Sequence, residues 1–202
     1  MKSLVLALVF LAWFATPANA DFDAGVAAYK SGDYATALQE WKPLAEKGDA
    51  AAQSKLGVAY SNGNGVPKDD KEAMRWYRLA ADQGYAGAQY MLGVMYYGGQ
   101  GVPQDYKEAM RWYRLVADQG NANAQYMLGV MYHGGQGVPQ DYKEAARWFL
   151  LAAEQGKTRA QAALALMYVL GQGVPQDLVQ ALRWTSRAAL KEARDWIAKI
   201  MS

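Results

Sequence analysis

The chain contains no cysteine and only one histidine, His133. Without cysteine no disulfide can form, so the fold must be held by packing alone. One imidazole is also too few ligands for a high-affinity zinc site. A histidine that acts as a general base needs a nucleophile and an orienting partner, and the sequence places neither. We therefore expect no catalytic residue, no metal and no cofactor.

The chain also lacks any block of like charge. Its 21 Lys and Arg and 19 Asp and Glu residues are interspersed and give a net charge of +2 at pH 7. Nucleic-acid-binding proteins carry clustered positive charge, so a nucleic acid partner is not expected. A hydrophobic content of 52% with 12% aromatics is incompatible with a disordered chain.

The N-terminus has the features of a secretory signal. Lys2 precedes the apolar run Leu4–Ala15, and Ala18-Asn19-Ala20 form a small-residue cleavage site. The run is too short for a membrane-spanning helix, which needs about 20 apolar residues. We predict that residues 1–20 are a cleavable signal peptide and that the protein is exported, either periplasmic or secreted, with no stable membrane insertion after cleavage.

A 36-residue pattern organises the rest of the chain. Four residue types return at this interval: Gln53, Gln89, Gln125, Gln161; Tyr60, Tyr96, Tyr132, Tyr168; Pro67, Pro103, Pro139, Pro175; and Trp76, Trp112, Trp148, Trp184. A fixed period in this range is typical of a solenoid, whose units bury their apolar faces against one another. We predict four units (49–84, 85–120, 121–156 and 157–190), preceded by a shortened tetratricopeptide-like unit (21–48) and followed by a C-terminal capping helix (191–202).

Each unit is predicted to form a helix, a glycine loop and a second helix. The first helices are expected at Ala50–Asn62, Ala86–Gly98, Ala122–Gly134 and Thr158–Leu170. An interior glycine, such as Gly57, costs about 1 kcal/mol relative to alanine, so its recurrence suggests the close approach of another helix. After the loop, Asp69 and its equivalents precede Glu72 and its equivalents by three residues, which predicts a capping box at the second helix. The recurring tryptophans are expected in the core.

The recurring residues, A-x-x-L-G-x-x-Y-x-x-G-x-G-V-P-x-D-x-x-x-A-x-x-W-x-x-x-A-A-x-x-G, resemble those of the Sel-one-like repeat family, a relative of the tetratricopeptide repeats. The resemblance implies an all-α, right-handed α/α superhelical solenoid with a concave surface made mostly by the first helices. Family members mainly act as scaffolds for protein partners. Exported relatives often carry a cysteine pair in each repeat, and this chain departs from them in having none.

One face of the first helices varies between units while the supporting positions recur. By the resemblance this face lines a concave groove that suits a protein or peptide partner, with aromatic side chains as anchors. The candidate groove residues are Ser54, Ser61, Tyr90, Val94, Tyr97, Tyr126, Val130, His133, Arg159 and Val169. The second and third units differ at only eight positions, so the alternative is that their tyrosines match through duplication and serve only in packing.

Two functions follow from these observations. The first is an exported, non-enzymatic scaffold that holds a protein or peptide partner in its groove, in envelope or host-interaction processes. The alternative is a penicillin-binding or β-lactamase-like enzyme acting on cell-wall or β-lactam substrates, as described for some exported relatives. A serine-acylating enzyme of that kind is expected to carry Ser-x-x-Lys. No lysine stands three residues after any of the mature serines: Ser31, Ser54, Ser61, Ser186 and Ser202.

Overall fold

The computed structural model describes residues 20–187 and 189, and within them it contains helices and no strand. The helices are α1 (Phe22–Ser31), α2 (Tyr34–Glu46), α3 (Ala50–Asn62), α4 (Asp70–Asp82), α5 (Ala86–Gly98), α6 (Tyr106–Ala117), α7 (Ala122–Gly134), α8 (Tyr142–Glu154) and α9 (Thr158–Leu170). Residues 178–187 form a further helical stretch. The predicted signal peptide and capping helix fall almost entirely outside the described residues.

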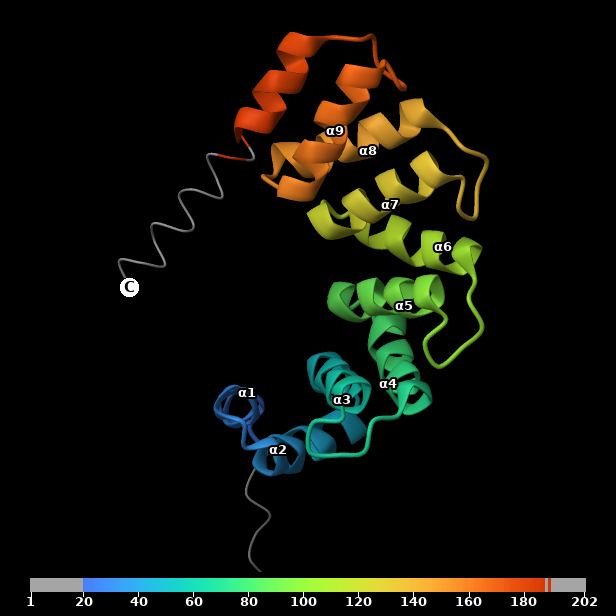
Figure 1. Cartoon of the computed structure of the whole chain (residues 1–202). Coiled ribbons are helices and arrows are strands. Elements are labelled where there is room, and N and C mark those ends of the chain that lie inside the picture. Colours follow the sequence, from blue (N-terminus) through green and yellow to red (C-terminus); the bar gives the residue numbers. More distant parts are fainter. Residues whose placement is uncertain (1–19, 188, 190–202) are drawn as a thin grey trace, which may run out of the picture.

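The helices pack in chain order. All extensive helix contacts join consecutive helices, from α1 with α2 to α8 with α9. The successive pairs follow one another along a curved path (Figure 1). The protein is an all-α, right-handed α/α superhelical solenoid, as the family resemblance implied. In the part of the chain described, every helix is too short or too polar to traverse a bilayer.

Local signals set the helix ends. The predicted bounds of α3, α5, α7 and α9 are confirmed. At each second helix the predicted N-cap is also confirmed; the carboxylate of Asp69, for example, accepts hydrogen bonds from the N–H groups of Lys71 and Glu72 at 2.9 and 3.0 Å. The other half of the predicted capping box, in which the Glu72 carboxylate accepts from the Asp69 N–H, is wrong. The Asp69 N–H donates instead to the Tyr60 carbonyl, and the Glu72 carboxylate pairs with Arg75 at 2.6 Å.

Within a unit, the interior glycine of the first helix lies against an aromatic ring of the second. A Cβ added at these glycines would stand 2.5–2.6 Å from ring carbons, which is far inside van der Waals contact; the pairs are Gly57 with Tyr77, Gly93 with Tyr113, and Gly129 with Phe149. The two helices therefore approach to a distance that only glycine permits. In the fourth unit Ala165 replaces the glycine, and by the repeat register Thr185 replaces the ring. The methyl group of Ala165 is thus accompanied by a smaller side chain, Thr185, at the position of the ring.

Between units, the recurring glutamine ties each first helix to the helix before it. The glutamine side chains are buried, with 4–7% exposed, and their amides donate to backbone carbonyls at the end of the preceding second helix. The bonds are Gln53 to Ala45, Gln89 to Ala81, Gln125 to Ala117 and Gln161 to Ala153, at 3.0–3.2 Å. Carbonyls in the last turn of a helix have no partner within the helix. The N–H of the glycine after the helix and the glutamine amide both donate to this carbonyl, and the glutamine bond joins neighbouring units.

The recurring tryptophans lie in the core, as predicted. Trp76, Trp112, Trp148 and Trp184 expose 2–7% of their surface. Arginines lie over their rings, with Arg78 and Arg111 both within 5.0 Å of the Trp112 centroid. At Trp112 and Trp148 one of the arginines, Arg78 and Arg114 respectively, comes from the preceding unit, so these two tryptophans also link units.

The contact between glycine and ring can be tested at Gly129. Gly129→Ala should destabilise the protein by about 1–3 kcal/mol, because the methyl group would overlap the Phe149 ring. In the double variant with Phe149→Thr, which copies the fourth unit, the loss should be at least about 1 kcal/mol smaller than the sum of the single losses. Urea unfolding followed by circular dichroism measures both.

The control is Gly134→Ala in the same helix, where an added Cβ meets nothing closer than 3.5 Å. This change should leave stability unchanged or raise it by up to about 1 kcal/mol. Additive losses at positions 129 and 149 would show that the two residues do not share a steric constraint.

Candidate binding face

The variable side chains of the first helices form one face, which we call the first-helix face. Its residues are Tyr90, Val94 and Tyr97 of α5, Tyr126, Val130 and His133 of α7, and Leu166 and Val169 of α9. Its tyrosines are half-buried rather than enclosed between helix layers. The rings of Tyr90 and Tyr126 rest on Tyr113 and Phe149, with centroids 5.6 and 5.7 Å apart. Each tyrosine ring thus packs on another aromatic ring on one side and remains partly exposed to solvent.

Two members of the face also contact the start of the second helix. Tyr97 and His133 lie edge-on to Tyr106 and Tyr142, with centroids 5.3 and 5.1 Å apart. The Tyr97 hydroxyl donates a hydrogen bond of 3.0 Å to Oε1 of Gln136 in the next unit. Tyr97 is therefore both a face residue and a link between units.

The remaining candidate residues differ in accessibility. Ser61 is half-buried, whereas Arg159 and Val169 are exposed at the N-terminal and C-terminal parts of α9. Ser54 is buried, with 8% exposed. Its short side chain therefore offers little surface to a partner, although its position in the repeat placed it with Tyr90 and Tyr126.

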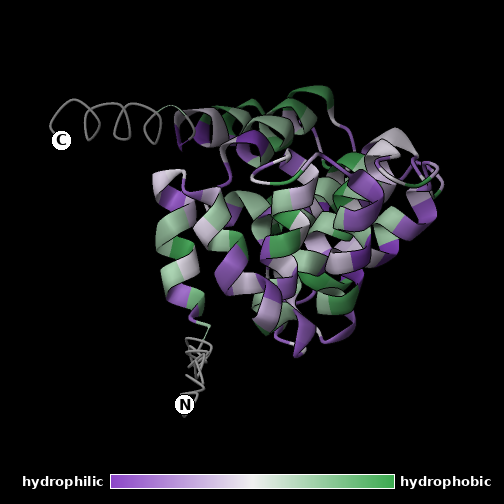
Figure 2. Cartoon of the chain, turned by 90° about the horizontal axis from the view of Figure 1, so that it is seen from below, coloured by the Kyte–Doolittle hydropathy of each residue, from purple (hydrophilic) through white to green (hydrophobic). Residues whose placement is uncertain are grey.

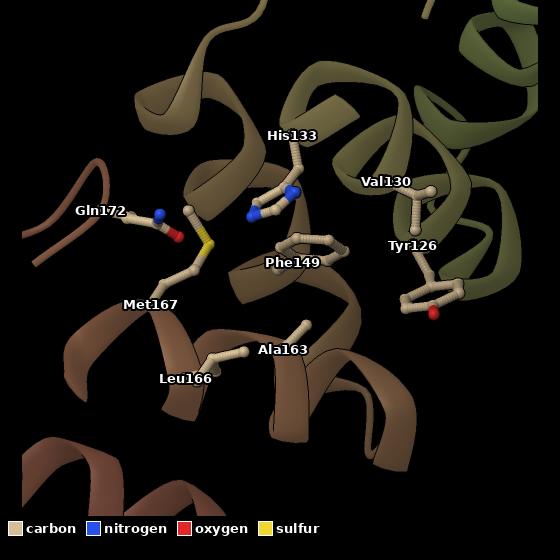
Figure 3. Close-up of a pocket in the computed structure, with 8 residues that line it drawn as sticks. All are labelled: Tyr126, Val130, His133, Phe149, Ala163, Leu166, Met167 and Gln172. Atoms are coloured by element: carbon tan, nitrogen blue, oxygen red, sulfur yellow. The ribbon is translucent and has the colours of Figure 1, made fainter. Parts of the chain in front are cut away.

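A pocket opens on the first-helix face between α7 and α9. Its volume is about 180 Å³, and it is lined by Tyr126, Val130, His133, Phe149, Ala163, Leu166, Met167 and Gln172. Figure 3 shows the side chains of His133, Phe149 and Met167 converging on it, with Tyr126 at one side and Gln172 at the other. The lining is mainly aliphatic and aromatic, with an imidazole, a phenol and an amide to accept or donate hydrogen bonds.

Side-chain size explains why the pocket lies here. One unit earlier, between α5 and α7, the repeat register puts Met127 where this site has Ala163, and Tyr97 where it has His133. The larger Tyr97 bonds to Gln136 across that earlier position. Phe149, Ala163, Met167 and Gln172 line the pocket but were not among the residues predicted from the sequence. The change from methionine to alanine at position 163 is the signal that could have found them.

The base of the face is uncharged. The Tyr113 hydroxyl is buried and has no hydrogen-bond partner among the described residues, and burial raises its pKa above the usual value. Burial also raises the pKa of Tyr90. Phe149 stands at the position of Tyr113 in the third unit, so the hydroxyl is not needed for packing. The face thus offers neutral phenols on an apolar floor.

The fourth unit exposes several aliphatic side chains. The exposed residues are Leu166, Val169, Leu170, Leu178, Val179 and Leu182, with 39–68% of their surface accessible. In Figure 2 the helices at the C-terminal end of the described chain carry green, hydrophobic stretches as well as purple, hydrophilic ones. Exposed aliphatic side chains of α9 and of residues 178–187 are therefore numerous at this end of the described chain.

A stack of helix–loop–helix units with recurring supports and a variable face defines the class of α/α repeat proteins. The Sel1 repeat model matches the chain at residues 50–85, 86–121, 122–157 and 158–192. These four matches begin one residue after the units read from the sequence. Because they cover more than half of the chain, the protein belongs to the Sel1 repeat family. Members of this family are commonly protein-interaction scaffolds and are generally non-catalytic.

Two solved structures are similar to the chain. A protective antigen with an SLR fold, present in uropathogenic Escherichia coli strains, shares 39% identity at a TM-score of 0.80 and covers 84% of this chain. A Sel1 repeat protein from Oxalobacter formigenes shares 37% identity at a TM-score of 0.80 and covers 85%. The chain spans 37% of the first protein and 70% of the second. No curated protein matches it in sequence.

The unpaired Tyr113 hydroxyl predicts a dependence of stability on alkaline pH. The raised pKa keeps Tyr113 neutral in the folded state, whereas the unfolded residue ionises near pH 10. Its contribution is therefore fully present below about pH 10 and is lost as the pH rises further. Tyr113→Phe should flatten the fall in stability between about pH 9 and 11, as measured by urea unfolding at each pH.

At neutral pH, Tyr113→Phe should be neutral or stabilising by about 1 kcal/mol, because it removes a buried polar atom without a partner. Tyr85→Phe is the control, since the Tyr85 side chain is exposed. An alkaline profile that Tyr113→Phe leaves unchanged would show that water reaches this hydroxyl in the folded protein.

Proposed function

We propose that the protein is an exported, non-enzymatic scaffold that binds a protein or peptide partner on its first-helix face. The observation that carries the proposal is the pocket between α7 and α9, formed where the lining of the face changes while its supports recur. Packing within the array explains the recurring glycines, glutamines and tryptophans. It does not explain an open, mainly apolar hollow beside half-buried tyrosines.

The chemistry of the pocket indicates the part of the partner that enters it. A volume of about 180 Å³ accommodates one bulky apolar side chain. Burying a leucine or phenylalanine side chain contributes about 1.5–3 kcal/mol. The phenols of Tyr90 and Tyr126 lie along the same face and can hydrogen-bond to the partner's backbone. A segment with one apolar anchor, lying across α5, α7 and α9, fits this arrangement.

Filling the pocket tests the proposal. Ala163→Met restores the residue that the third unit carries at position 127, so the fold should tolerate it. A partner would first be identified by cross-linking in envelope extracts and then purified. We expect Ala163→Met to weaken binding of the purified partner at least tenfold, measured by calorimetry, because the methionine occupies the space for its anchor.

The matched control is Leu115→Ala, which removes an exposed side chain from the second helix α6. It should leave the affinity unchanged. Combined replacement of Tyr90, Tyr97 and Tyr126 by alanine should abolish binding while the helical spectrum is retained. A partner that binds both Ala163→Met and this triple variant as tightly as the parent would refute the first-helix face as its site.

Export is supported by the signal features of residues 1–20. That the similar Escherichia coli protein is a protective antigen supports a role in the envelope or at the host. We expect the mature protein to begin at Asp21 and to be recovered from the periplasm or the medium. Fractionation of a tagged copy followed by N-terminal sequencing measures this. An intact N-terminus in the cytoplasmic fraction would contradict export.

The proposal assigns no catalytic residue. The serine-acylating alternative lacks its Ser-x-x-Lys motif in the mature sequence. Covalent labelling of the purified protein by a fluorescent penicillin, or hydrolysis of nitrocefin, would overturn the non-enzymatic assignment.

A further inference from the structure

The second helices carry a repeated ion pair on their outer surface. A glutamate in the first turn pairs with an arginine three residues on: Glu72 with Arg75, Glu108 with Arg111, and Glu144 with Arg147, at 2.6–3.1 Å. The first pair is bidentate, since Arg75 Nε donates to Oε2 and Nη2 donates to Oε1 of Glu72, and Arg111 binds Glu108 through the same two nitrogens. In each of these units the arginine charge is therefore matched by a carboxylate.

The fourth unit keeps the arginine and loses the carboxylate. Arg183 stands in the register of the paired arginines, but Gln180 occupies the position of the glutamates. One turn later, Arg187 replaces the leucine found in the other units at Leu79, Leu115 and Leu151. Both changes make this place more positive. Neither Arg183 nor Arg187 forms an ion pair with any described residue.

These residues enclose a small pocket. Gln180, Arg183, Trp184 and Arg187 line a hollow of about 140 Å³. Trp184 is 7% exposed and belongs to a buried cluster against which Leu150 of α8 packs, so it forms a fixed wall. The Arg187 guanidinium lies 4.8 Å from the centre of its ring. The hollow therefore has a rigid aromatic side, two guanidinium groups and an amide that can donate a hydrogen bond.

We propose that this pocket binds a carboxylate from a partner peptide. The argument is the register: in the three preceding units the arginine at this position pairs with a carboxylate, and here Gln180 stands at the position of that carboxylate. Planar guanidinium groups match carboxylates through paired hydrogen bonds. The Gln180 amide can add a third donor where glutamate would repel the ligand. The site lies on the second helix, so it is independent of the first-helix face.

The test uses a tetraglutamate peptide, acetylated and amidated, with tetraglutamine as the uncharged control. At constant ionic strength, the side-chain N–H signals of Arg183, Arg187 and Trp184 should shift in nuclear magnetic resonance titrations with tetraglutamate only. Gln180→Glu restores the repeat pattern and should weaken binding at least tenfold, because the new carboxylate pairs with Arg183. The other units already carry glutamate there, so the fold should be unaffected.

Arg183→Gln should also abolish the shifts, whereas Arg147→Gln, which removes an arginine already paired with Glu144, should retain them. Tetra-alanine with a free C-terminus is a second probe, and its binding would identify a chain terminus as the source of the carboxylate. The proposal is overturned if sodium chloride produces the same shifts as tetraglutamate, or if Gln180→Glu binds tetraglutamate as well as the parent does. Neither result would bear on the first-helix face.

Discussion

The absence of a side chain at one position of the first helix sets the geometry of the array. At Gly57, Gly93 and Gly129 the ring of the second helix occupies the space that a Cβ would need. This contact fixes how closely the two helices of a unit approach. Glycine by itself lowers the stability of a helix, so only tertiary packing explains why it recurs here. The same contact recurs at Gly25 against Trp41, which shows that α1 and α2 pair in the same way.

Two further contacts fix the orientation of the two helices of one unit relative to the next unit. The buried glutamine binds the end of the preceding second helix, and the second glycine of the loop lies against the start of that helix. At Gly101, an added Cβ would stand 2.5 Å from the Asp70 carbonyl oxygen, and the backbone has a φ of 71°. Glycine is required there for both reasons. The supports are thus constrained, whereas the first-helix face is free to vary.

The sequence predicted the fold because its signals are local and repeated. Glycine stops and a constant period were sufficient to place α3, α5, α7 and α9, and aspartate caps placed the starts of α4, α6 and α8. Competition between side chains was harder to foresee. The Glu72 carboxylate was predicted to accept a hydrogen bond from a backbone N–H. The Arg75 guanidinium lies one turn away and binds this carboxylate more strongly than a neutral N–H would. The pocket was not predicted, because it depends on the combined volumes of side chains such as His133 and Ala163, which come from different units.

The fourth unit departs from the others at positions that packing does not govern. Lys71, Lys107 and Lys143 are exposed in units that have a following neighbour, yet Val179 stands in their register. Arg187 likewise replaces leucines that are partly exposed in the preceding units. A side chain in solvent contributes little to stacking, so the array itself does not require either change. An aliphatic residue and a cation at such positions are better explained by contacts made outside the repeat stack. The fourth unit therefore carries exposed side chains that packing between the described helices does not require.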